Sequence, residues 1–252
     1  MIKLDIFFEI HKDLPREGPG NNEATKKAFS FLKELPPNPR ILDIGCGPGM
    51  QTIQLTKMAD CKIIALDTHQ PFLDELNRRA KSEGVQDRIE IVNNSMFSMD
   101  FEDDFFDVIW SEGAIYIFGF EKGLKEWRRF LKRRGYFVVS EVSWLKQNPP
   151  EEIKGFWEKY YPSIKLIEKN IRIIKNLGYN FLHNFTIPES GWWEEYYIPL
   201  EKRIALLRKK YHGNIEAKKA LDQELEEITF YKKYSEYYGY VFYIMQKKDP
   251  DK

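Results

Sequence analysis

The chain has 252 residues, of which 42% are apolar and 31% are charged, and its 39 basic residues equal its 39 acidic residues in number. The resulting net charge of zero argues against a nucleic-acid partner, because phosphate binding depends on clustered positive charge. No apolar run reaches the ~20 residues of a membrane helix. Two cysteines are too few for a disulfide framework, and no residue cluster has metal-ligand spacing. We therefore expect a cytoplasmic protein without a membrane or metal partner.

In chain order, residues 1–37 are expected to form an N-terminal lid segment with a helix near 23–35, which ends at a proline-rich stretch beginning with Pro36. Beyond it, short apolar strands alternate with segments of helical spacing. This alternation predicts a parallel sheet with helices on both faces. The predicted strands are 40–44, 61–66, 88–92, 105–111 and 136–142, and the predicted helices are 50–58, 72–82 and 120–131, the last closed by Gly135.

The alternation changes after Trp144. Helices are expected within 150–178, a strand at 179–187 and a final strand at 239–246. Between these two strands, residues 191–236 show helical stripes of apolar side chains and are expected to form a helical insertion that caps the substrate site. The whole chain, 1–252, is therefore interpreted as a single domain whose core spans residues 38–145.

A glycine-rich loop follows the first predicted strand and precedes a predicted helix. Its sequence is Asp43-Ile44-Gly45-Cys46-Gly47-Pro48-Gly49. A turn without Cβ atoms allows a ligand to lie against the backbone. Asp67 ends the second predicted strand, where a carboxylate can accept hydrogen bonds from both hydroxyls of a ribose. A ligand that contains a nucleoside is expected at this edge of the sheet.

The region 38–145 resembles class I S-adenosylmethionine-dependent methyltransferases. The glycine loop resembles their first motif, acid-x-Gly-x-Gly-x-Gly, and Asp67 resembles their ribose-binding acid. Further resemblance lies in Asn94-Ser95-Met96, which matches the segment at the adenine edge, in Phe106-Asp107-Val108-Ile109, which matches the start of the fourth strand, and in Leu131 to Glu141, which matches the glycine turn and fifth strand. The core is similar to that of quinone-biosynthesis methyltransferases, but no quinone substrate is inferred.

The resemblance implies a Rossmann-like, doubly wound α/β fold with a mostly parallel seven-stranded sheet and an antiparallel last strand. It also implies S-adenosylmethionine as the cofactor. The implied cofactor-binding residues are Asp43, Gly45, Cys46, Gly47, Gly49, Asp67, Thr68, Asn94, Ser95, Met96 and Ser111.

Two positions depart from the family pattern. Ser95 stands where aspartate is usual, although its hydroxyl can still bond the adenine amino group, and Arg133-Arg134-Gly135 replaces a common Pro-Gly-Gly turn. The alternative ligand, a dinucleotide, requires Gly-x-Gly-x-x-Gly, with glycine at the position of Met50. The methyltransferase interpretation is favoured over it.

The acceptor site lies outside the matched region. Glu112, at the end of the fourth predicted strand, is the candidate catalytic residue because it could attract a substrate amine, but it could equally cap the next turn. The same pair of interpretations applies to Glu141, with capping favoured. Aromatic rings beside acids suit a cationic molecule, although large aromatics at helical spacing more often form core. The candidate substrate-binding residues are Tyr116, Trp144, Trp192 and Tyr196.

These features predict methyl transfer to a small-molecule acceptor by in-line displacement, with nitrogen favoured as the acceptor atom. The cofactor carries the reactivity, so the protein mainly aligns the reactants and excludes water. The alternatives are a binding module without turnover and a methyltransferase that acts on a peptide. Residues 18–23 form a turn that is either part of a lid over the cofactor or a plain surface turn.

Overall fold

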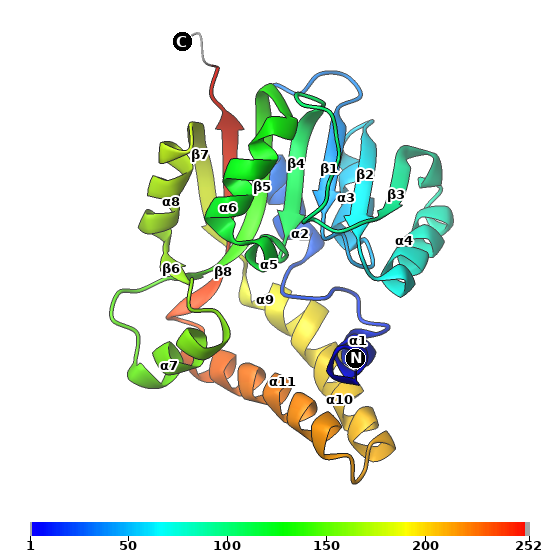
Figure 1. Cartoon of the computed structure of the whole chain (residues 1–252), viewed down its shortest axis with the longest axis vertical. Helices are drawn as coiled ribbons and strands as arrows, with labels where there is room; N and C mark the ends of the chain where they lie inside the picture. Colours follow the sequence, from blue (N-terminus) through cyan, green and yellow to red (C-terminus); the bar gives the residue numbers. More distant parts are fainter. Residues whose placement is uncertain (1, 250–252) are drawn as a thin grey trace.

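The computed structural model describes residues 2–249, which form one sheet covered by helices (Figure 1). The strand order is β3-β2-β1-β4-β5-β8-β7, and a short strand, β6, pairs with the end of β5. Strands β1 to β5 pair in parallel, while β8 runs antiparallel between β5 and β7. The predicted Rossmann-like sheet with an antiparallel last strand is confirmed, with β6 as an eighth strand. The strands are β1 Arg40–Ile44, β2 Lys62–Asp67, β3 Ile89–Asn93, β4 Phe106–Glu112, β5 Leu131–Trp144, β6 Lys165–Leu166, β7 Tyr179–Thr186 and β8 Tyr238–Lys247.

Helices occupy both faces of the sheet and the region beyond one of its edges (Figure 1). They are α1 Ile2–His11, α2 Asn22–Phe29, α3 Met50–Met58, α4 Gln70–Ser82, α5 Ile115–Phe118, α6 Phe120–Glu126, α7 Glu151–Tyr160, α8 Ile167–Asn176, α9 Glu189–Trp192, α10 Ile198–Lys210 and α11 Ile215–Tyr234. Short 3₁₀ turns cover Gln86–Arg88 and Trp127–Phe130, and a π-helical turn, Trp193–Tyr197, joins α9 to α10. Within residues 2–249, no helix combines the length and apolar character that crossing a membrane requires.

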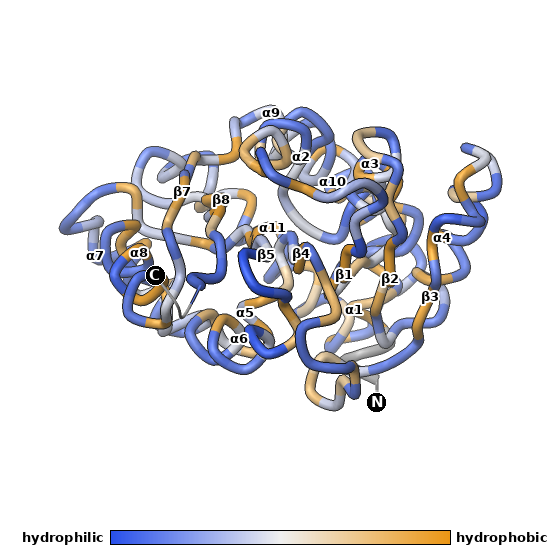
Figure 2. The backbone as a smooth tube through the Cα atoms, turned by 90° about the horizontal axis from the view of Figure 1, so that it is seen from above, coloured by the Kyte–Doolittle hydropathy of each residue, from blue (hydrophilic) through white to orange (hydrophobic). Residues whose placement is uncertain are grey.

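The central strands are apolar because both of their faces are buried. In β1, Ile41 packs into one apolar cluster and its neighbour Leu42 into another on the opposite face. Strands buried on both faces read as continuous apolar runs, and Figure 2 shows this colouring along β1 and β2. In β1, the apolar residues Ile41, Leu42 and Ile44 are all buried, which agrees with the predicted central strand at 40–44.

Strand β5 begins earlier than predicted, at Leu131. Leu131 is fully buried and pairs with Phe106 at the start of β4, so the chain leaves the helix after a 3₁₀ turn. Gly135 was expected to close the helix, but it lies within β5, where the pairing with β4 shifts register and Arg134 has a φ of 58°. Between the pairs Phe106–Leu131 and Val108–Tyr136, β5 has three more residues than β4, so the expected turn is an irregularity within the strand.

A cap of helices lies beyond the edge at which the parallel strands end (Figure 1). The helical cap consists of α1 together with residues 189–234, which connect β7 to β8. Its interior is aromatic, with Trp192 stacked on Tyr231 at a ring-centroid distance of 4.0 Å. Because α1 packs against α10 and α11, the N-terminal segment belongs to the same layer.

His11 connects α1 to the rest of the helical cap. Its Nδ1 lies 3.0 Å from the Phe7 carbonyl oxygen and its Nε2 lies 3.2 Å from the Tyr196 hydroxyl oxygen. A carbonyl only accepts, so Nδ1 carries the proton and Nε2 of the neutral ring accepts from Tyr196. Burial lowers the pKa of His11 from 6.5 to about 4.

His11 should make the protein less stable in weak acid. The unfolded chain takes up the proton near pH 6.5 and the folded chain near pH 4, so the stabilisation is complete above pH 6.5 and is lost as the pH falls towards 4. Between pH 7.5 and pH 5, the free energy of unfolding measured in urea should fall by about 2 kcal/mol more for the wild type than for a His11→Gln variant. Equal losses in the two proteins would contradict this assignment.

Candidate functional site

A cavity of about 550 Å³ lies at the edge where the parallel strands end. This is a typical size for small-molecule sites, which range over roughly 300–1,000 Å³. It is bordered by the loop after β1 and the ends of β2 and β4, at the point where the strand order reverses. The sequence-predicted residues that line it are Gly45, Cys46, Gly47, Asp67, Thr68, Asn94, Ser95, Met96, Glu112 and Tyr116.

Gly47 and Asp67 form one wall of this cavity. Gly47 has a φ of 52°, and a Cβ atom there would lie 3.3 Å from Cγ of Glu17, so a larger side chain would fill the space along the loop. The Gly47 backbone N–H donates to Oδ2 of Asp67 at 3.0 Å. Two further backbone N–H groups, those of Thr68 and His69, donate to Oδ1 of Asp67. The backbone thus holds the carboxylate in one orientation at the end of β2.

Three of the predicted cofactor residues lie behind the cavity wall. Asp43 is fully buried and accepts the Thr52 hydroxyl at 2.6 Å, and burial raises the pKa of Asp43 to about 7. Ser111 donates to the Ile44 carbonyl at 3.0 Å. Gly49 begins α3 with a φ of 82°, and a Cβ atom there would lie 2.1 Å from Leu76 of α4. These residues shape and support the loop, and the structure does not place them in contact with the cavity.

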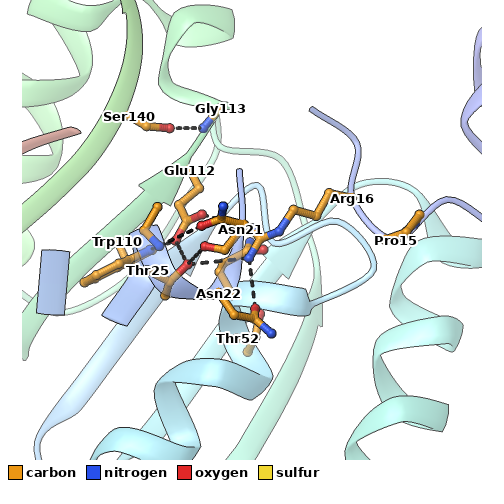
Figure 3. Close-up of polar contacts among 12 residues, drawn as sticks. Pro15, Arg16, Asn21, Asn22, Thr25, Thr52, Trp110, Glu112, Gly113 and Ser140 are labelled. Carbon is orange, nitrogen blue, oxygen red and sulfur yellow. Dashed lines mark hydrogen bonds and ion pairs between the residues drawn. The ribbon is translucent and has the colours of Figure 1, made fainter. Parts of the chain in front are cut away.

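Residues 14–20, which we call the strap, run across the cavity and are fastened at several points. Arg16 forms an ion pair with Glu112 at 3.0 Å, and both side chains are only 5% exposed (Figure 3). Arg79 of α4 donates to the carbonyl of Pro15 at 3.0 Å. At its far end, the Gly20 N–H donates to the carbonyl of Gly191 in α9. The strap therefore joins the sheet, α4 and the helical cap. Its residues Gly18 and Pro19 line the cavity, so they do not form a plain surface turn.

Glu112 lines the cavity, but its carboxylate already has three donors. Oε2 accepts from Arg16, while Oε1 accepts the Thr25 hydroxyl at 2.8 Å and Nε1 of Trp110 at 2.9 Å (Figure 3). These three donors occupy both oxygens of the carboxylate and connect β4 to the strap and to α2. This geometry favours an anchoring role for Glu112, and its catalytic role remains a prediction.

Glu17 of the strap lies in the cavity lining with both carboxylate oxygens buried and without hydrogen-bond partners in residues 2–249. Burial and, to a lesser extent, the nearby Asp67 carboxylate together raise the pKa of Glu17 to about 9. Buried polar groups are nearly always hydrogen-bonded, so an unpaired carboxyl at a cavity indicates a ligand with a donor or a positive charge. S-adenosylmethionine carries hydroxyls, an ammonium and a sulfonium, and thus fits this wall.

The candidate acceptor residues occupy different places. Tyr116 borders the cavity and is 40% exposed. Trp144 is half-buried and lies edge-on to Tyr238. The interpretation of Trp192 and Tyr196 as pocket lining requires correction, because both rings are buried in the core of the helical cap, where Trp192 stacks on Tyr231.

Sequence reasoning missed Arg16 and Glu17, together with an apolar border. Isolated charged residues in a loop look like solvated surface, and the neighbouring Gly18 turn was the available signal. The missed apolar residues are Phe7, Phe8, Phe72, Phe97 and Ile117, which also line the cavity. In residues 2–249, no group of three or more His, Cys, Asp or Glu side chains is arranged to hold a metal ion.

Comparisons with known proteins place the cavity in context. Residues 42–139 match the family described as "Methyltransferase domain". The chain is 25% identical over 171 residues to a sterol 24-C-methyltransferase of Aspergillus fumigatus, covering 64% of this chain and 45% of that protein. It is also 25% identical over 122 residues to a sarcosine/dimethylglycine N-methyltransferase of Halorhodospira halochloris, covering 48% of this chain and 44% of that protein. The chain thus spans about half the length of these curated relatives.

A solved structure shares the fold over nearly the whole chain. It is a SAM-dependent methyltransferase from Geobacter sulfurreducens in complex with S-adenosyl-L-homocysteine, with a TM-score of 0.83 and 21% sequence identity. The alignment covers 97% of this chain and 98% of the other. The likeness therefore includes the helical cap as well as the sheet.

Proposed function

We propose that this chain, whose core is a class I S-adenosylmethionine-dependent methyltransferase domain, transfers a methyl group to a nitrogen atom of a small-molecule acceptor. The observation that carries the proposal is the cavity of about 550 Å³, which joins the glycine loop and Asp67 at one side to Tyr116 at the other. Its size and its cover of strap and helical cap suit a small molecule better than a peptide.

The chain's own residues would bind the cofactor and exclude water. Asp67 is placed to accept the ribose hydroxyls, and Gly47 leaves room for the ligand along the loop. The backbone and side chains of Asn94, Ser95 and Met96 would hold the adenine edge. When bound, S-adenosylmethionine supplies an electrophilic methyl group on a sulfonium, whose departure leaves a neutral thioether.

The apolar border and the strap would shield the site from water. Phe8, Phe72 and residues 15–19 of the strap all line the cavity. With the cofactor providing the reactivity, alignment and desolvation by these residues are the protein's main contribution to the rate. The nitrogen acceptor is supported by carboxylates near Tyr116 and is compatible with the N-methyltransferase among the relatives.

A carbon acceptor is the second candidate, favoured by the apolar border and by the sterol methyltransferase among the relatives. Incubation with cofactor labelled in its methyl group, against matched panels of amines, phenols and isoprenoid alkenes, separates the candidates. We expect label to appear in amines and to be absent with an Asp67→Ala variant. Label only in phenols or alkenes would refute the nitrogen assignment. Tight cofactor binding without label in any panel would instead favour a binding module.

A further inference from the structure

Tyr116, at the border of the cavity, lies among carboxylates from two distant parts of the chain. Glu141 comes from β5, and Glu224 and Glu227 come from α11, which passes below the end of β5 in Figure 1. Partial burial, followed by the negative charges of Glu227, Glu141 and Glu224, raises the pKa of Tyr116 to about 12. We call Tyr116, Tyr161 and the three glutamates the Tyr116 cluster.

Ring and hydrogen-bond geometry connects Glu141 to Tyr116. The rings of Tyr116 and Tyr161 meet edge-on at a centroid distance of 5.9 Å. The Tyr161 hydroxyl donates to Oε1 of Glu141 at 2.5 Å. Across the cluster, the hydroxyl of Tyr197 donates to Oε1 of Glu227 at 3.0 Å. Tyrosine hydroxyls therefore hold one oxygen of each of these two carboxylates.

The second oxygen of Glu141 is the independent sign of a ligand. The Glu141 side chain is only 2% exposed, and its Oε2 is buried without a hydrogen-bond partner in residues 2–249. Burial raises the pKa of Glu141 to about 8. Buried carboxyl oxygens are costly to leave unpaired, so this position requires a donor that the described residues do not supply.

Glu224 and Glu227, the two carboxylates of α11, also favour a positively charged ligand near this position. Burial and, to a lesser extent, the neighbouring charge of Glu227 together raise the pKa of Glu224 to about 8. The positive charge of Lys165 lowers the pKa of Glu141, but burial outweighs it. No lysine or arginine in the part of the chain that the structure describes forms an ion pair with Glu141, Glu224 or Glu227.

We propose that the Tyr116 cluster binds the cationic amine of an acceptor that carries no carboxylate of its own. The proposal rests on the proposed function, because Tyr116, the member of the cluster that lines the cavity, connects the cluster to the same site. The positive charge of the amine would offset the repulsion between Glu224 and Glu227, and an N–H or O–H of the same molecule would supply the donor that Oε2 of Glu141 lacks. The tyrosine rings would stabilise the same charge through cation–π contact.

Exclusion of a carboxylate follows from the same electrostatics. An amino acid would bring a negative group beside Glu141, Glu224 and Glu227, whose raised pKa values show that this part of the protein already disfavours negative charge. The predicted acceptors are therefore alkylamines without an acid group. The substrate class would differ from that named for the sarcosine/dimethylglycine N-methyltransferase.

The test uses a cation that cannot itself be methylated. Choline and its neutral isostere, 3,3-dimethylbutan-1-ol, are titrated into full-length protein saturated with S-adenosylhomocysteine. Choline should bind at least tenfold more tightly than the isostere, and an E224Q/E227Q variant should lose that preference. Glu216→Gln, an exposed residue of the same helix, is the matched control and should bind as the wild type does. Equal binding of cation and isostere, or no binding of either, would overturn the proposal.

Two further readouts keep the result unambiguous. Removing like charges should leave the melting temperature of the E224Q/E227Q variant unchanged or raised, so loss of choline binding with an intact melting transition reports on the site itself. Binding of choline without methylation of any amine would retain the cluster and refute the nitrogen acceptor. Methylation of amines that the double variant leaves unaffected would confirm the function and refute the cluster.

Discussion

Replacing Asp67 with alanine will weaken the binding of S-adenosylmethionine by at least about 100-fold. The carboxylate is held by the backbone N–H groups of Gly47, Thr68 and His69 at the wall of the cavity. Hydrogen bonds from a ligand to a charged group contribute roughly 1.5–3 kcal/mol each. Loss of two such bonds to the ribose hydroxyls therefore corresponds to a factor of about 100 or more.

Isothermal titration of the wild type and the Asp67→Ala variant measures this difference. Asp74→Ala is the control, because Asp74 is an exposed acid on α4 outside the cavity lining. An Asp67→Asn variant retains an acceptor and should fall between the two. A folded Asp67→Ala protein with undiminished affinity would show that the cofactor does not use this carboxylate.

Breaking the ion pair between Arg16 and Glu112 will produce the largest loss of stability among single substitutions of charged residues. Both side chains are only 5% exposed, so an Arg16→Met variant leaves a buried carboxylate without its counter-charge. Such losses cost about 3–5 kcal/mol. The strap would also lose its link to β4, so cofactor affinity should fall together with stability.

A double-mutant cycle separates the pair from its surroundings. The Arg16→Met/Glu112→Gln protein should be more stable than Arg16→Met alone, because no unpaired charge is left buried. Arg208→Met breaks an exposed pair with Asp222 and should cost less than about 1 kcal/mol in the same urea-unfolding assay. Additive effects of the two buried substitutions would show that the pair has no coupling energy.

The parts of this protein that were predictable from sequence depend on short-range signals. The loop from Asp43 to Gly49 lies between a strand and a helix in sequence, so its meaning is local. Asp67 could be assigned because it ends a strand that adjoins β1, and parallel strands finish at a common edge. The sheet could be predicted because the apolar pattern of each strand is likewise local in the sequence.

The remaining parts of the site depend on contacts between distant residues. Trp192 and Tyr196 could as easily have faced a pocket as a core, and the packing of Tyr231 on Trp192 decided between these outcomes. Arg16 acquires its role only because Glu112, 96 residues away, lies opposite it. The prediction that Gly135 ends a helix was wrong, because the buried Leu131 already begins β5 and this outweighed the local tendency of glycine to end a helix.

The position of the helical cap also bears on the order in which the protein folds. The contact between His11 and Tyr196 joins residues 185 positions apart, and β8 reaches β7 only after the intervening α9–α11 segment. Contacts that close such long loops require a large loss of chain entropy before the contacts themselves can stabilise the fold. We therefore expect the β1–β5 core to form before α1 docks. The helical cap would then cover the cavity in the last step. Before that step, intermediates would expose the apolar ends of the strands to solvent and to other unfolded molecules.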